Sequence, residues 1–254
     1  MLLVMDVGNT TTMLGVYDGE RRVAQWRLAT SRARTVDEYG VLTTGLFSAA
    51  AVDMKAIGSI AISSVVPPLN PILEEMSRSY FGHKPLLIEP GVRTGMPVLT
   101  DNPQEVGADR IVNGVAAFAR WGGPLIVIDF GTATTFDLIS AKGEYLGGVI
   151  APGLGISAEA LFERAARLPR VAIRRPPRVV GKNTVHCMQA GLWFGYAGLV
   201  EGIVSRMRAE IGGEIRVVAT GGFVSILSEE LPFVDGTDPY LTLEGLRLIA
   251  ERNA

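Results

Sequence analysis

The stretch Leu125-Ile-Val-Ile-Asp-Phe-Gly-Thr-Ala-Thr-Thr-Phe-Asp-Leu138 decides the fold. Its first four residues are apolar and predict a buried strand. Asp129 stands at the tip of that strand, and Gly131 predicts a sharp turn in which the backbone can approach a ligand closely. The turn therefore predicts a binding site at the end of a central strand.

Hydroxyl groups follow this turn at Thr132, Thr134 and Thr135. Together with the backbone N–H groups of the turn, they suit an anion, most simply a phosphate. A carboxylate beside an anion implies that a cation lies between them, so a bound metal ion is expected near Asp129.

A second copy of this pattern opens the chain, in Met1-Leu-Leu-Val-Met-Asp-Val-Gly-Asn-Thr-Thr-Thr12. The residues that align after a displacement of about half the chain are Asp6 with Asp129, Gly8 with Gly131, Asn9 with Thr132, and Thr11 and Thr12 with Thr134 and Thr135. The repeat predicts an internal duplication. The alternative is two unrelated hairpins that share turn chemistry.

Composition narrows the class of protein. The 254 residues are 48% apolar and 20% charged, with a net charge of −2, which fits folded cores and no general attraction to nucleic acid. Cys187 is the single cysteine, so no internal disulfide is expected and a cytoplasmic location is favoured. No apolar run reaches the ~20 residues of a membrane span, and no signal peptide is recognised. His83 and His186 are the only histidines, which disfavours a histidine-centred triad or metal site.

The pattern of apolar residues and turns predicts an α/β fold of two duplicated domains, 1–121 and 122–254. Each is expected to contain a mixed sheet in the order βββαβαβ with flanking helices, and the active-site cleft is expected between them. A capping box at Thr35 opens the first helix, and Thr184 is expected to cap a long helix to about Ile211. Gly191, Gly195 and Gly198 in that helix permit close packing, either within the chain or in a dimer.

The two turns suit the phosphates of a nucleotide. Neither a P-loop nor a dinucleotide-binding glycine motif is present. Asp6 and Asp129 are candidate metal contacts, although each could also be an ordinary turn carboxylate. Thr220-Gly221-Gly222 ends a later strand and would let the backbone approach an adenine ring; a plain turn is the alternative. The arginine-rich loop 170–182 is more typical of a solvated or subunit-contact loop than of a substrate clamp.

Phosphoryl transfer also needs a base that is not occupied by metal. Asp109 is the best candidate, on a helix predicted from Gln104 to Trp121, where Glu105, Asp109 and Asn113 would form one polar stripe. Arg110 could hold an anionic group of a substrate. The alternatives are a solvated helix face and a surface arginine.

Together these motifs resemble the type III pantothenate kinases, within the actin, sugar kinase and heat-shock ATPase superfamily. The matching segments, which occur in the same order over essentially the whole chain, are Asp6–Thr10, Asn102–Arg110, Asp129–Thr135, Gly147–Gly153, Gly181–Thr184, Met188–Gly191 and Thr220–Gly222. The resemblance implies that the two domains are ribonuclease-H-like (actin-like ATPase) domains. It also implies ATP-dependent phosphorylation of pantothenate, the first step toward coenzyme A, by a cytoplasmic homodimer.

The resemblance also implies roles for individual residues. Asp109 would accept the proton. The residues implied to contact pantothenate are Gly107, Ala108, Asp109, Arg110, Thr184 and Thr100. The residues expected to contact ATP are Asp6, Val7, Gly8, Asn9, Thr10, Thr11, Thr12, Gly131, Thr132, Thr220, Gly221 and Gly222. Asp129 would bind K⁺ or NH₄⁺, and Mg²⁺ would accompany ATP near Asp6.

Two departures from the family pattern matter. Thr100 stands where many members carry a tyrosine that contacts pantothenate, and Ala190 replaces a serine. Two other functions therefore stay open: a kinase for a different small molecule, and a non-catalytic regulator that binds nucleotide on the same fold.

Overall fold

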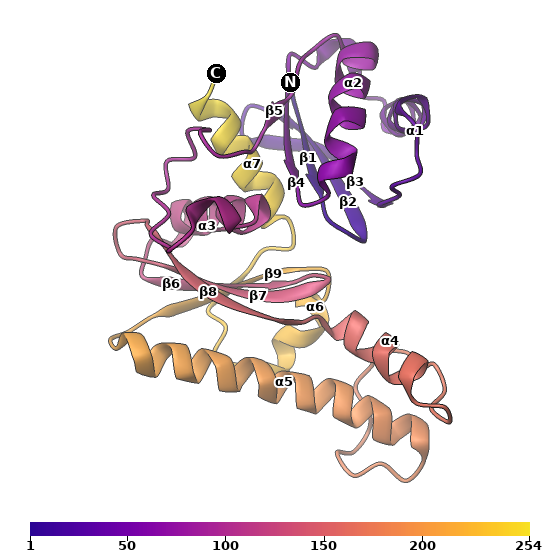
Figure 1. Ribbon diagram of the computed structural model, residues 1–254, viewed down its shortest axis with the longest axis vertical. Coiled ribbons are helices and arrows are strands. Elements are labelled where there is room, and N and C mark those ends of the chain that lie inside the picture. The colour runs from indigo at the N-terminus through magenta and orange to yellow at the C-terminus, as the bar shows by residue number, and fades with distance from the viewer. The chain divides into compact units, whose positions relative to one another are not determined.

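The computed structural model describes residues 1–254, and the chain forms two compact units (Figure 1). The first unit contains Met1–Pro97, Asp101–Arg120 and Leu241–Ala254; the second contains Val98–Thr100 and Trp121–Tyr240. The expected halves, 1–121 and 122–254, differ from these units at the C-terminus. Helix α7 (Leu241–Arg252) packs on the first sheet, because its buried leucines face strands of that sheet.

The first unit is built on a five-stranded sheet in the order β3-β2-β1-β4-β5. Its strands are β1 (Leu2–Val7), β2 (Thr11–Asp18), β3 (Arg21–Ala29), β4 (Ser59–Ser64) and β5 (Leu86–Leu87). Strands β1, β2 and β3 form an antiparallel meander, and β4 and β5 continue parallel to β1.

Helices cover both faces of this sheet. They are α1 (Val36–Ala49), α2 (Asn70–Phe81), α3 (Ala108–Trp121) and α7, with short 3-10 turns at Met54–Ala56, Pro67–Leu69 and Pro103–Glu105. The predicted capping box is confirmed at the start of α1, where Glu38 N donates to Thr35 Oγ1 and Thr35 N donates to Glu38. Tyr39 and Phe47 of α1 join the core formed by alternate residues of β1, and α7 covers the other face, where Leu243 approaches Gly15.

The second unit repeats this design with a sheet in the order β10-β9-β6-β7-β8. Its strands are β6 (Leu125–Phe130), β7 (Ala133–Ile139), β8 (Tyr145–Pro152), β9 (Arg216–Gly221) and β10 (Gly236–Thr237). Its helices are α4 (Leu154–Arg164), α5 (Thr184–Ile211) and α6 (Val224–Leu227), followed by a 3-10 turn at Ser228–Glu230. Figure 1 shows α5 lying along one face of the sheet, and Ile126, Ile128 and Phe130 pack toward it. The predicted order βββαβαβ is confirmed in the first unit, and the second unit differs from it in having two helices, α4 and α5, between β8 and β9.

The two hairpins differ in register by one residue. Val7 pairs with Thr12, whereas Phe130 pairs with Thr134, so the second turn is one residue shorter. The structural counterpart of Thr12 is therefore Thr134, and the sequence alignment that paired Thr12 with Thr135 was wrong. Asp129 consequently faces Thr135, where Asp6 faces Met13.

Two helix starts also differ from expectation. Helix α3 begins at Ala108 because Val106 is extended after the 3-10 turn at Pro103, so Glu105 lies outside the helix. Asn113 is buried and accepts a hydrogen bond of 2.7 Å from Thr242 Oγ1. The predicted polar stripe is therefore wrong. Helix α5 is capped by Asn183, whose side chain accepts from His186 N, and Thr184 is its first residue.

No helix combines the length and the apolar character needed to span a bilayer. The core in each unit instead lies between its sheet and its helices.

A pair of glycine substitutions tests the packing of α7. A Cβ on Gly245 would overlap the Val112 carbonyl oxygen, whereas a Cβ on Gly45 of α1 would meet nothing within 4 Å. We expect Gly245→Ala to destabilise the protein by about 1–3 kcal/mol through overpacking. Gly45→Ala should stabilise it by about 0.5–1 kcal/mol through helix propensity. Chemical denaturation measures both, and equal effects would contradict the packing of α7 on α3.

Candidate active site

The first candidate phosphate turn joins β1 to β2. Gly8 N donates to Thr11 O at 3.0 Å, and a Cβ on Gly8 would lie 3.1 Å from that oxygen, so a side chain is poorly tolerated. Asn9 and Thr10 are exposed at the tip. Thr12 is instead fully buried, and its hydroxyl lies 2.8 Å from Thr30 Oγ1. The tip therefore offers backbone and polar side chains to a ligand, while Thr12 anchors the turn from inside.

Thr30 and Arg32 support this turn and were missed by sequence analysis. Thr30 N donates to Thr10 O at 2.9 Å, and Thr30 Oγ1 donates to Gly8 O at 2.7 Å. Arg32 donates to Asn9 Oδ1 at 3.2 Å. Both residues follow β3, whose end pairs with the start of β2, and this pairing was the signal available in the sequence.

Asp6 is near the end of β1, in register with Ser63 of β4. Ser63 is fully buried, and its hydroxyl has no hydrogen-bond partner. Val65, just after β4, donates its N–H to Val7 O at 3.0 Å, so the ends of β1 and β4 stay together beyond the sheet.

Asp109 lies beside these strand ends within the first unit. A Cβ on Gly107 would be 2.5 Å from Asp109 Oδ1 and 3.8 Å from Val65 Cγ1. The carboxylate therefore occupies the space that a side chain at 107 would fill, and Gly107 is required for its position. The structure thus brings Gly107, Asp109 and the end of β1 together.

The environment of Asp109 alters its acidity. Burial raises the pKa of this carboxyl above its ordinary value. Arg110 opposes the rise through its backbone N–H, which donates to Asp109 Oδ1 at 2.9 Å, and through its positive charge. A carboxylate with a raised pKa is a better proton acceptor than an ordinary aspartate.

The second candidate phosphate turn joins β6 to β7. Gly131 N donates to Ala133 O at 3.1 Å, and Thr132 is exposed at the tip. Gly153 supports the turn from behind: its N–H donates to Thr132 O at 3.1 Å, and a Cβ there would overlap that oxygen. Thr134 is buried and bonded to Tyr196 of α5, so its hydroxyl does not serve this tip.

Asp129 and the end of β9 lie together in the second unit. Asp129 is in register with Thr220, and a Cβ on Gly221 would be 2.5 Å from Asp129 Oδ1. Gly221 also has a φ of 96°, which favours glycine. Gly222 follows and is exposed. The second unit therefore gathers Asp129, Gly131 and Thr220–Gly222 at the C-terminal ends of the neighbouring strands β6 and β9.

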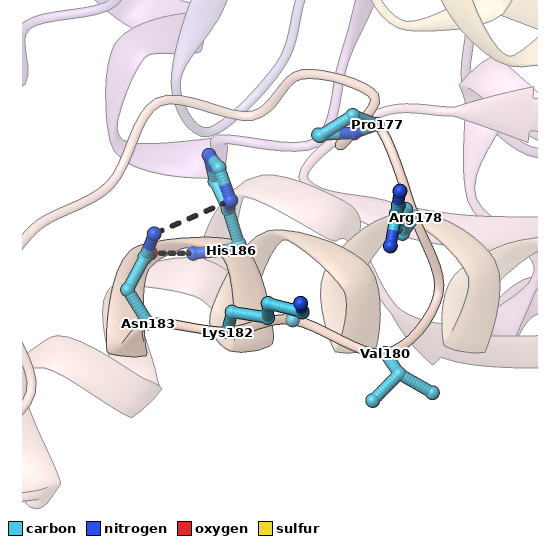
Figure 2. Close-up of a pocket in the computed structure, with 7 residues that line it drawn as sticks. Pro177, Arg178, Val180, Lys182, Asn183 and His186 are labelled. Carbon is cyan, nitrogen blue, oxygen red and sulfur yellow. Dashed lines mark hydrogen bonds between the residues drawn. The ribbon is translucent and has the colours of Figure 1, made fainter.

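Thr184 and Thr100 also belong to the second unit. Thr184 is exposed at the start of α5, beside a cavity of about 370 Å³ lined by Pro177, Arg178, Val180, Gly181, Lys182, Asn183 and His186 (Figure 2). Figure 2 shows the Asn183 side chain bonded to the His186 N–H and ring. Thr100 follows Leu99, whose N–H donates to Tyr145 O at 2.8 Å. The Thr100 hydroxyl is buried without a hydrogen-bond partner.

The donor groups in each unit fit the ligands that the sequence suggests. Within either unit, no three His, Cys, Asp or Glu side chains converge on one point. A cation at Asp129 would therefore need hydroxyl or carbonyl oxygens as further ligands, which suits a hard cation. The exposed tips and their glycines suit the phosphates of a nucleotide.

Comparison with known proteins decides the family. The family model described as "Type III pantothenate kinase" matches residues 2–206. The type III pantothenate kinase of Koribacter versatilis is 58% identical, with 100% of this chain and 96% of that protein covered. That of Moorella thermoacetica is 56% identical, and both chains are covered completely. This chain belongs to the type III pantothenate kinase family.

The fold comparison agrees with this assignment. A putative Baf family transcriptional activator from Campylobacter jejuni superposes with a TM-score of 0.62 at 20% identity, covering 99% of this chain and 98% of that one. At that identity the likeness shows the fold alone. The fold consists of two units with five-stranded sheets of matching strand order, as the repeat predicts.

The pKa of Asp109 leads to a pH-dependent effect on stability. Because its pKa is raised by folding, ionisation opposes folding, and the stability present below about pH 4 is lost as pH rises through the folded pKa. Asp109→Asn removes this cost, so its unfolding temperature should exceed that of the wild type at pH 7.

This advantage of Asp109→Asn should shrink as pH falls to about 4. Thermal unfolding followed by circular dichroism across this range measures it. Asp18→Asn, at an exposed carboxylate, is the control and should show no such trend. A difference between Asp109→Asn and wild type that is independent of pH would contradict the raised pKa.

Proposed function

We propose that the protein transfers the γ-phosphoryl group of ATP to the primary hydroxyl of pantothenate, forming 4′-phosphopantothenate in the first step of coenzyme A biosynthesis. The observation that carries this proposal is the 58% identity over the whole chain to a type III pantothenate kinase. The placement of Asp109 beside Gly107 supports it, because a protein that only binds nucleotide has no use for a partly buried carboxylate with a raised pKa.

ATP is proposed to engage both phosphate turns. Gly8 to Thr11 and Gly131-Thr132 would contact its phosphates through backbone N–H groups and exposed hydroxyls. Mg²⁺ would accompany the nucleotide near Asp6 and screen the phosphate charge. Thr220 to Gly222 would lie against the adenine, where the missing side chains allow close approach.

Asp109 is proposed as the catalytic base. Its carboxylate would take the proton of the pantothenate hydroxyl while that oxygen forms a bond to the γ-phosphorus, and the bond to the leaving ADP oxygen breaks. Arg110 would bind the carboxylate of pantothenate through charge-assisted hydrogen bonds. Gly107, Ala108, Thr184 and Thr100 would complete the contacts; Thr100 supplies a hydroxyl where many relatives place a tyrosine.

A monovalent cation, K⁺ or NH₄⁺, is proposed at Asp129. When bound, it would offset negative charge next to the second phosphate turn. The oxygen-rich surroundings of Asp129 support this assignment, since its strand neighbours Thr135 and Thr220 both carry hydroxyls.

A homodimer through α5 is also proposed. Gly191, Gly195 and Gly198 are exposed, and a Cβ on any of them would meet nothing of this chain within 4 Å. This open space supports the second of the two explanations for these glycines, a seam with a second copy of the helix that would use their small size.

The assignment of the base predicts a specific loss of activity. Asp109→Asn should lower kcat by about 10²–10⁴-fold, because proton transfer is lost while the amide keeps the shape of the side chain. The KM for ATP should change little. The assay follows phosphopantothenate from labelled ATP with K⁺ and Mg²⁺. Asp18→Asn is the matched control and should keep full activity. Absence of product with wild-type protein would reject the proposed function.

The proposed dimer is tested by measuring the molar mass of the protein in solution. Gly195→Arg places a long charged side chain on the proposed seam and should convert a dimer to a monomer of 27.1 kDa, as measured by light scattering after gel filtration. Gly45→Arg, on an exposed position of α1, is the control and should leave the mass unchanged. A wild-type monomer, or a Gly195→Arg dimer, would contradict the seam.

A further inference from the structure

A buried acidic cluster on β7 and β8 has no part in the function proposed so far. Asp137 is 0% exposed. Tyr145 Oη donates to its Oδ1 at 2.7 Å, and Thr135 Oγ1 donates to its Oδ2 at 3.1 Å. Burying a carboxylate is costly even when it is hydrogen-bonded. Two apolar residues would fill the space with less penalty, so the cluster calls for a functional reason.

The position of the cluster supplies that reason. Thr135 is the cross-strand partner of Asp129, and their side chains leave the same face of the sheet. Asp137 lies two residues further along β7, so it shares that face. Helix α5 covers the opposite face, where Thr134 meets Tyr196. A continuous row of polar side chains therefore runs from Tyr145 through Asp137 and Thr135 to Asp129.

The other unit lacks this row. The residue that faces Asp6 across β1 and β2 is Met13, where the second unit has Thr135. The duplicated hairpins have thus diverged at the position beside the strand-end carboxylate. Thr135 offers a hydroxyl oxygen next to Asp129, whereas Met13 offers a thioether next to Asp6. Hard cations prefer oxygen ligands, so this difference favours a hard cation at Asp129.

The hydrogen bond to Asp137 fixes the direction of the Thr135 hydroxyl. A hydroxyl group has one proton and two lone pairs. Because Thr135 Oγ1 donates to the Asp137 carboxylate, its proton points toward Asp137, and its lone pairs remain for the side of Asp129. Without Asp137, the Thr135 hydroxyl could turn and donate to Asp129, which would place a proton where a cation must bind.

We propose that Thr135 is a ligand of the monovalent cation held by Asp129, and that Asp137 is a positioning residue that directs the Thr135 hydroxyl toward this cation. The inference rests on the cation site in the proposed function. It adds two residues to that site and gives a reason for the buried carboxylate.

The experiment measures K⁺ binding through stability. The midpoint of thermal unfolding is recorded as KCl replaces choline chloride at constant ionic strength, without nucleotide and again with Mg–ADP. The wild type should show a saturable rise. Thr135→Val should raise the half-saturating K⁺ concentration by about tenfold or more. Thr135→Ser should keep this concentration within about threefold of the wild-type value.

The positioning role of Asp137 has its own signature. Asp137→Asn should weaken K⁺ binding, and the double variant with Thr135→Val should be no weaker than Thr135→Val alone, because Asp137 acts through Thr135. Tyr145→Phe removes the hydrogen bond from Tyr145 to Asp137, and Thr134→Val removes the neighbouring hydroxyl on the α5 face. Both are controls and should stay within about twofold of wild type.

Several results would overturn the inference. One is Thr135→Val binding K⁺ as tightly as wild type. Another is a double variant whose loss is the sum of the two single losses. If Asp137→Asn does not fold, the ligand role of Thr135 is decided by comparing the K⁺ affinities of Thr135→Val and Thr135→Ser. Equal K⁺ affinities of these two variants would reject that role.

The outcome also separates this inference from the proposed function. A wild-type protein that forms phosphopantothenate but shows no K⁺-dependent stabilisation in either condition would reject the cation site and leave the kinase intact. A protein that is stabilised by K⁺ through Thr135 but forms no phosphopantothenate would reject the kinase and leave the site intact.

Discussion

In each unit, one backbone hydrogen bond across a hairpin turn determines how the candidate site residues are arranged. Gly8 N donates to Thr11 O, and Gly131 N donates to Ala133 O. Each bond closes a turn at the end of a central strand, and each turn sets the register of its hairpin. Because side chains alternate between faces, the register decides which residues stand beside Asp6 and Asp129 and which point into the core. A change of one residue in either turn would exchange these sets.

Much of the fold could be predicted from the sequence because its signals are local. The apolar runs before Asp6 and Asp129 predicted the central strands, and the capping box at Thr35 predicted the start of α1. The placement of α7 could not be predicted this way, since it depends on contacts with strands β1, β2 and β4, more than 170 residues earlier in the chain, as with Gly15 and Leu243. Local patterns carry no information about such distant partners.

The candidate site was predictable to the same extent. The turns and Asp109 follow from residue types at short spacing, but their geometry does not. The helix around Asp109 was extended too far because Val106 fits a helical pattern, whereas the structure holds it extended before Gly107. Thr30 supports the first turn through contacts 20 and 22 residues away, which no spacing rule would reveal. The alignment of threonines failed for a related reason: matching residue types hid a turn that is one residue shorter.

Gly107, two residues before Asp109, shows how the position and the raised pKa of the Asp109 carboxyl arise from one feature. Without a side chain at Gly107, the Asp109 carboxylate can fold back over the backbone and become buried. Burial raises the pKa of the carboxyl, and the adjacent Arg110 amide holds its oxygen in place. This arrangement lowers stability at neutral pH, and it would orient Asp109 for its proposed role as a base. A larger residue at 107 would push the carboxylate toward solvent, and it would lose its orientation and its raised pKa together.

Duplication explains why the two units share this architecture, and divergence explains why their sites need not share a role. The strand-end carboxylate is kept in both, yet its neighbour is Met13 in one unit and Thr135 in the other. A thioether beside Asp6 would leave that carboxylate to a metal ion that brings its own oxygen ligands, such as the proposed Mg²⁺ bound to phosphates. A hydroxyl beside Asp129, held by a buried acid, would instead build part of the proposed cation site into the protein itself. The one-residue difference between the turns places Thr135 beside Asp129, so the proposed difference in function would follow from the difference in register.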